Sequence, residues 1–147
     1  VLMGDHGGGQ AQLKAVATKL DAKYAGKGIR VVFCDEVYAK ANGDFDKFLI
    51  ANNYPTSSHA GIPDTSEMLY LGNDKGWVRK DLVKDALGDP VLPQGQRPDP
   101  AKPRINNGIS GDGRKSTAEL GKKLFEMKTD YAVKQIKSLL STPSSAQ

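Results

Sequence analysis

The sequence predicts an α/β fold built on a parallel sheet. Residues 1–3 form a short apolar run, and a glycine-rich loop separates them from residues 10–24, whose apolar side chains recur at helical spacing. Residues 29–34, "IRVVFC", are apolar at most consecutive positions, which is typical of a strand covered on both faces. A strand, a helix and a second strand in this order predict a right-handed βαβ unit.

Helices and irregular segments are expected over the rest of the chain. Residues 43–54 and 63–71 predict two short helices, the second with a proline at its start. Residues 73–108 hold most of the prolines and little periodicity, which predicts a long irregular excursion. Residues 115–140 carry the apolar stripe of a long amphipathic helix. We therefore expect one domain over residues 1–142, followed by a flexible tail over residues 143–147.

The composition is that of an ordinary globular domain. The chain has 147 residues, of which 38% are hydrophobic and 26% charged. Its net charge of +4 comes from dispersed lysines without a basic run, so we expect no nucleic-acid binding. No apolar stretch approaches the roughly 20 residues of a membrane span, so we expect no membrane insertion. Cys34 is the single cysteine, and its apolar neighbours predict a buried core residue.

The two histidines of the chain are both expected in loops. His6 follows the first apolar run, and His59 lies in the loop that opens the predicted helix over residues 63–71. Open α/β sheets bind ligands beyond the carboxyl ends of their strands, so both imidazoles are expected near a cleft. His6 with Asp5, and His59 with Asp64, are residue types that bind zinc, manganese or iron. The pattern indicates a candidate metal site with fewer ligands than a dinuclear centre needs.

Two other classes of function stay open at this point. Gly7, Gly8 and Gly9 precede a helix, so a nucleotide or sugar phosphate could bind the free N–H groups there. Neither G-x-G-x-x-G nor a P-loop pattern is present, and Asp5 would repel a phosphate. The second alternative is a non-catalytic binding or structural module.

Three segments together resemble the creatininase family of metal-dependent amidohydrolases. "GDHGGGQ" at residues 4–10 and "HAGIPDTSEML" at residues 59–69 resemble its two signature loops. "GISGDGRKSTAELGKKLFE" at residues 108–126 is similar to its closing segment. The resemblance implies a three-layer α/β/α fold with a mostly parallel sheet. It also implies a hydrolase that opens a small cyclic amide or cleaves a formamide with a metal-activated water.

The resemblance also assigns roles to single residues. It implies that His6 binds a divalent metal, that His59 acts on the substrate as an acid or base, and that Asp64 replaces a catalytic glutamate. Zinc, manganese or iron is the implied cofactor, and a small amide is the implied substrate. The loop residues expected around that substrate are Asp5, Gly7, Gly8, Gly9, Ser58, Thr65 and Ser66.

The resemblance further implies that this chain is the C-terminal part of a creatininase-like domain. Family members carry additional metal ligands in an N-terminal half, and residues 1–147 do not supply them. We therefore expect that half, or a partner chain, to complete the site, and we expect a homo-oligomer. A cytoplasmic location is favoured, with export as the alternative.

Overall fold

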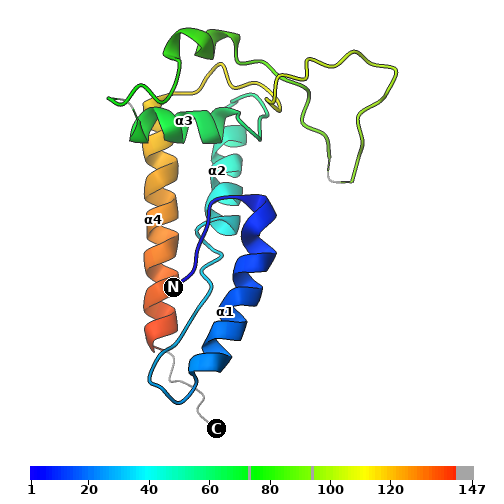
Figure 1. Cartoon of the computed structure of the whole chain (residues 1–147). Helices are drawn as coiled ribbons and strands as arrows, with labels where there is room; N and C mark the ends of the chain where they lie inside the picture. The colour runs from blue at the N-terminus through cyan, green and yellow to red at the C-terminus, as the bar shows by residue number, and fades with distance from the viewer. Residues whose placement is uncertain (73, 94, 142–147) are drawn as a thin grey trace. The chain divides into compact units, whose positions relative to one another are not determined.

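Helices form most of the regular structure in the computed structural model, which describes residues 1–72, 74–93 and 95–141 (Figure 1). The chain divides into two compact units. Unit 1 comprises Val1–Asp44 and the chain from Glu126 onward, and unit 2 comprises Phe45–Phe125. The helices are η1 (Gly7–Gly9), α1 (Gln10–Tyr24), α2 (Ala39–Ala51), α3 (Ile62–Leu71), η2 (Lys80–Asp85) and α4 (Ala118–Ser141), where η denotes a 3₁₀-helix.

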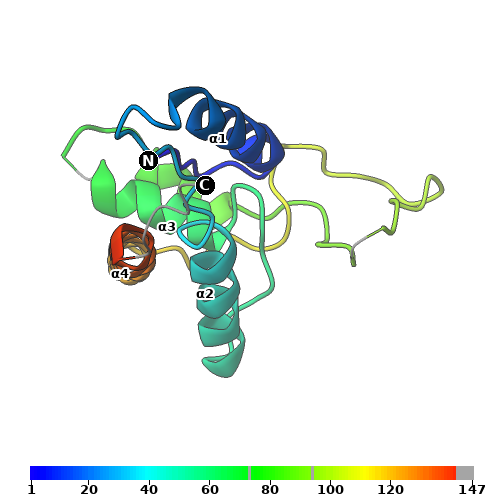
Figure 2. The same cartoon turned by 90° about the horizontal axis from the view of Figure 1, so that it is seen from below.

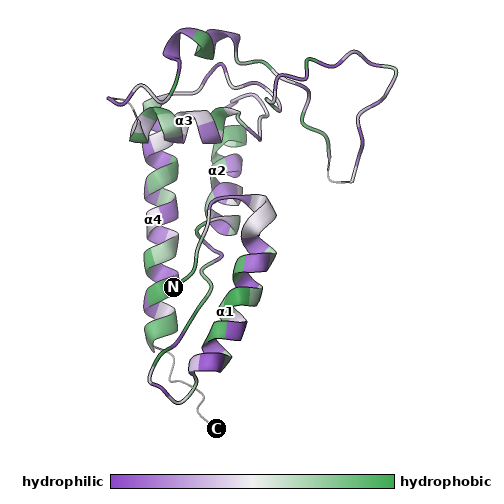
Figure 3. Ribbon diagram, viewed as in Figure 1, coloured by the Kyte–Doolittle hydropathy of each residue, from purple (hydrophilic) through white to green (hydrophobic). Residues whose placement is uncertain are grey.

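The helix predictions from apolar spacing are confirmed, with shifted ends. α1 begins and ends at the predicted residues, whereas α2 begins at Ala39, earlier than predicted. α4 begins at Ala118 because Thr117 caps it: the Leu120 N–H donates to Thr117 Oγ1 at 3.2 Å. Apolar and polar residues alternate along α4, as Figure 3 shows. The predicted tail over residues 143–147 lies outside the described residues.

The predicted three-layer α/β/α fold with a mostly parallel sheet is wrong. In the described part of the chain, extended segments pair only through isolated bridges. The two predicted strands meet in one parallel bridge, where the Leu2 N–H donates to the Val32 carbonyl and the Cys34 N–H donates to the Leu2 carbonyl, both at 2.8 Å. The strand–helix–strand order is therefore present, but as a single bridge.

The local sequence explains why this pairing stays so short. Residues 1–3 are too few for a ladder, and an isolated pair of extended segments is marginal without a third strand. At the other end, a turn begins directly after Cys34 and leads into α2, where the Ala39 N–H donates to the Asp35 carbonyl at 2.9 Å. The apolar run over residues 29–34 is also only partly covered, since Ile29 is exposed and Cys34 is fully buried.

Unit 1 is held together by a small apolar core and by polar contacts from α4. Ala17, Cys34 and Ala41 are its buried apolar residues, which confirms the prediction for the cysteine; burial also raises the pKa of the Cys34 thiol. From α4, Gln135 donates to Asp35 Oδ1 at 2.7 Å and accepts the Glu36 N–H at 3.1 Å. These contacts fix the turn that follows the bridge.

Unit 2 packs α3 against the first half of α4. Gly121 of α4 lies so close to α3 that a Cβ built on it would overlap the backbone of Ser66. Stacked and tilted rings add to the packing, namely Phe45 with Phe48 and Tyr70 with Phe125. The buried apolar side chains of this unit are Phe45, Leu49, Ile62, Leu69, Leu120 and Leu124.

The predicted excursion over residues 73–108 is confirmed as largely irregular, apart from η2. Part of it projects away from α3, and Figures 1 and 2 show this from two sides. The Asp89 carboxylate joins two positions within this excursion, because it accepts hydrogen bonds from the N–H groups of Ile105 at 2.8 Å and Asn106 at 3.2 Å. These bonds, led by that from Ile105, and the nearby Arg104 lower the pKa of the Asp89 carboxyl. None of the described helices has both the length and the apolar character that a membrane crossing requires.

Candidate functional site

The first motif loop belongs to unit 1, where it passes from the parallel bridge into α1. Asp5 and His6 are exposed, and the following glycines form η1. The Gln10 side chain donates to the carbonyls of Gly4 and His6, both at 2.9 Å, and so holds the loop from inside. A Cβ at residue 8 would lie 3.0 Å from the His6 imidazole Nε2, so a side chain at that position would displace this exposed ring.

Lys128 of α4 anchors this loop through its acidic residue. The Lys128 ammonium lies 2.6 Å from the Asp5 carboxylate, and only 9% of the lysine side chain is exposed, against 53% for the aspartate. Asp5, which the resemblance places near a substrate, has its carboxylate paired with this lysine. Lys128 is absent from the predicted site. The sequence nevertheless indicates it, because a lysine four residues after Leu124 lies on the apolar side of a predicted amphipathic helix.

Loss of Asp5 is expected to destabilise the first motif loop. Asp5→Ala removes the carboxylate that lies 2.6 Å from the largely buried Lys128 ammonium, and we expect the loss of this charged hydrogen bond to cost about 1–3 kcal/mol of unfolding free energy. Urea unfolding of the variant and of the parent chain measures the difference. Equal unfolding free energies would contradict this account.

The second motif loop belongs to unit 2 and opens α3. His59 is exposed, and the next residue, Ala60, has a φ of 51°. Two side chains from the first turns of α3 stabilise this left-handed residue. The Ala60 N–H donates to Asp64 Oδ2 at 2.7 Å, and the Thr65 hydroxyl donates to the Ala60 carbonyl at 3.1 Å. Asp64 therefore holds the backbone directly after His59.

The closing motif, residues 108–126, is hydrogen-bonded to the second motif loop at Ser58 and His59. The Ser58 N–H donates to the Ser110 carbonyl at 2.9 Å, and the Ser110 N–H donates to the His59 carbonyl at 2.9 Å. Gly111, with a φ of 86°, continues this antiparallel pairing, and a Cβ on it would overlap the Thr56 carbonyl. Two of the three motif segments are therefore brought together within unit 2.

Ser66 has a structural position inside unit 2. Its side chain is fully buried in α3, and its hydroxyl accepts the Thr117 N–H at 3.2 Å just before α4. Ser58 is exposed and Thr65 partly exposed. The partnership of the Ser110 backbone with His59 was missed by sequence reasoning, because no local pattern reports a contact between residues this far apart in the chain.

Asp112 follows the closing turn and is paired within its own segment. It accepts hydrogen bonds from Arg114 Nε at 2.9 Å and Arg114 Nη2 at 2.7 Å, and these bonds, with help from the backbone and from Lys115, lower the pKa of the Asp112 carboxyl to about 2. The carboxylate is therefore ionised at neutral pH and occupied by its own neighbour.

The described residues do not make a complete metal site. No group of three or more His, Cys, Asp and Glu side chains among residues 1–72, 74–93 and 95–141 could hold a metal ion. His6 and Asp5 lie in unit 1, whereas His59 and Asp64 lie in unit 2. The Asp5 carboxylate is already engaged by Lys128, and one Asp64 oxygen by the Ala60 N–H. We therefore assign no chemical step to a metal ion.

Comparison with known proteins gives the family of the chain. The model of the creatininase family, described as creatinine amidohydrolase, matches residues 1–136. No curated protein and no solved structure matches the chain significantly. The match spans the first loop, the second loop and the closing motif, and so confirms the resemblance on which the site prediction rests. The chain belongs to the creatininase family.

Proposed function

We propose that this protein is an amidohydrolase that cleaves the C–N bond of a small cyclic amide or of a formamide. Family membership supports hydrolysis of an amide bond. The observation that carries the proposal further is the arrangement around His59: Asp64 accepts the N–H of the next residue, Ala60, and the Ser110 N–H donates to the His59 carbonyl. An exposed imidazole on a backbone fixed by hydrogen bonds can contact a small substrate that approaches from solvent.

The chemistry that we propose for His59 is proton transfer to the leaving nitrogen. Water oxygen adds to the amide carbonyl carbon, the C–N bond breaks, and the nitrogen departs as an amine after taking a proton. Imidazole is the side chain that exchanges protons most readily near neutral pH, so it can accept the proton from the water and deliver it to the nitrogen. Asp64 acts in this proposal as a positioning residue, because its carboxylate contacts the loop backbone.

Metal dependence is part of the proposal on the ground of family membership alone. The implied cofactor is zinc, manganese or iron, and His6 is the ligand that the family resemblance implies in this chain. A small amide is the proposed partner. Completion of the site by an N-terminal half or a partner chain, and assembly into a homo-oligomer, stay predictions.

Turnover of a panel of amides tests this function. The chain, purified together with the N-terminal half or partner chain expected to complete its site, is incubated with creatinine, other small cyclic amides and formamides, each with Zn²⁺, Mn²⁺ or Fe²⁺ or with a chelator, and products are followed by NMR. We expect ring opening or deformylation of at least one compound, and loss of that turnover with the chelator. Turnover that persists in chelator would contradict the metal requirement alone. No turnover by folded protein under any of these conditions would contradict the hydrolase proposal.

A further inference from the structure

A small cavity lies in unit 2 between the end of α2 and the segment that precedes His59. Its volume is about 180 Å³. Apolar side chains from Leu49, Ile50 and Val91 form much of its wall, and Ser57 and Ser58 close it on the side of the second motif loop. A cavity of this size and lining accommodates a small molecule with a short apolar body.

Asp46 is the one acidic side chain among the residues that line this cavity. No hydrogen bond or ion pair joins its carboxylate to another residue in the described part of the chain. Partial burial without a compensating partner raises the pKa of the Asp46 carboxyl, although the residue as a whole keeps exposed surface. A cation placed in the cavity would offset this cost and stabilise the charged form of the carboxyl.

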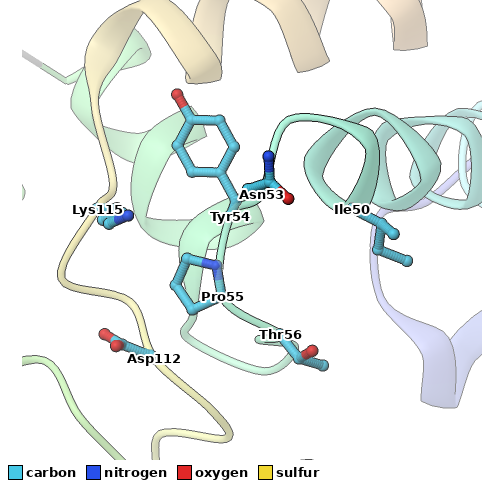
Figure 4. Close-up of a pocket in the computed structure, with 7 residues that line it drawn as sticks. All are labelled: Ile50, Asn53, Tyr54, Pro55, Thr56, Asp112 and Lys115. Carbon is cyan, nitrogen blue, oxygen red and sulfur yellow. The ribbon is translucent and has the colours of Figure 1, made fainter.

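The charged residues of the neighbouring cavity indicate which of the two cavities a cationic ligand prefers. It has a volume of about 510 Å³ and shares Ile50, Tyr54, Pro55 and Thr56 with the smaller one (Figure 4). Lys115 and Asp112 line only this larger cavity, and Asp112 is paired with Arg114. The positive charge of Lys115 disfavours a cation there, so a cationic group is directed to the cavity that contains Asp46.

We propose that the smaller cavity binds an alkylammonium ion with a short branched or linear chain, and that Asp46 supplies the counter-charge. The apolar body lies against Leu49 and Val91, and the ammonium group meets the carboxylate. This inference goes beyond the proposed hydrolysis and does not depend on it, because it concerns binding to a cavity that excludes His59 from its lining.

Binding of isobutylammonium chloride, compared with isobutanol at the same ionic strength, tests the inference. The backbone amides of Ser57, Ser58 and Val91 are followed by ¹H–¹⁵N NMR during titration of the full chain. We expect saturable shifts with the amine in the millimolar range. Asp46→Asn is expected to weaken amine binding about fivefold, as for a partly exposed charge pair, and to leave alcohol binding unchanged.

Two further variants separate charge from shape. Asp74→Asn removes the same charge from an exposed position that lines neither cavity, so we expect amine affinity equal to that of the parent chain. Val91→Phe fills the cavity and is expected to abolish the shifts from both ligands. The proposal is overturned by a lack of saturable shifts, by equal amine affinity in Asp46→Asn and the parent chain, or by equal weakening in Asp74→Asn. The Asp46→Asn comparison decides the matter even where Val91→Phe does not fold.

Discussion

Gly121→Ala is expected to destabilise unit 2 by about 1–3 kcal/mol. The new Cβ would overlap the carbonyl group of Ser66 and approach the Glu67 nitrogen to 2.8 Å. These are backbone atoms of α3, so relief requires α3 and α4 to move apart, and overpacking of this kind commonly costs about 1–3 kcal/mol. Alanine is favoured over glycine by about 1 kcal/mol in helix propensity. We expect the steric cost to exceed this gain.

Gly43→Ala provides the matched control for this steric effect. Gly43 lies inside α2, and a Cβ built on it meets nothing within 4 Å. The same substitution there is expected to stabilise the chain by about 0.5–1 kcal/mol, since only the helix propensity changes. Urea unfolding of both variants gives the two free energies. A Gly121→Ala variant as stable as the parent chain would show that the contact between α3 and α4 is looser than described.

The contrast between helices and strands shows what the sequence could predict. Helix periodicity is a local property, so the spacing of apolar side chains placed α1 and most of α4 correctly. A strand depends on partners elsewhere in the chain. The run over residues 29–34 has the composition of a buried parallel strand, yet in the described residues it pairs only around Phe33 with Leu2. The composition of this run indicated its preference for extended structure, but it could not indicate how many strands would pair with it.

The candidate site divides in the same way. The pattern of apolar runs placed His6 and His59 in loops, and both lie in loops and are exposed. The groups that hold these loops were harder to predict. Lys128 is far from Asp5 in sequence, and the Ser110 backbone is far from His59, so each contact appears only when the chain is folded. Asp64 is intermediate: its position in the first turn of α3 is typical of a carboxylate that accepts backbone N–H groups at a helix start.

Under the proposed function, His59→Ala is expected to lower kcat by about 10²–10⁴-fold. This is the usual contribution of a positioned general acid or base. The substitution removes an exposed imidazole and leaves in place the hydrogen bonds made by the backbone of residues 58–60, so the unfolding free energy is expected to change by less than about 0.5 kcal/mol. Gln96→Ala, an exposed substitution in the excursion, serves as the control and is expected to keep full turnover.

Rescue by added imidazole separates a chemical role of His59 from a structural one. In His59→Ala, free imidazole at millimolar concentration can diffuse to the vacated position, because the parent side chain is exposed there. If His59 transfers a proton, turnover rises with imidazole concentration and follows the protonation state of the added base. If His59 only shapes the loop, imidazole cannot restore that shape and turnover stays low at every concentration. Full turnover in His59→Ala without imidazole would instead remove this residue from the reaction altogether and leave the family assignment intact.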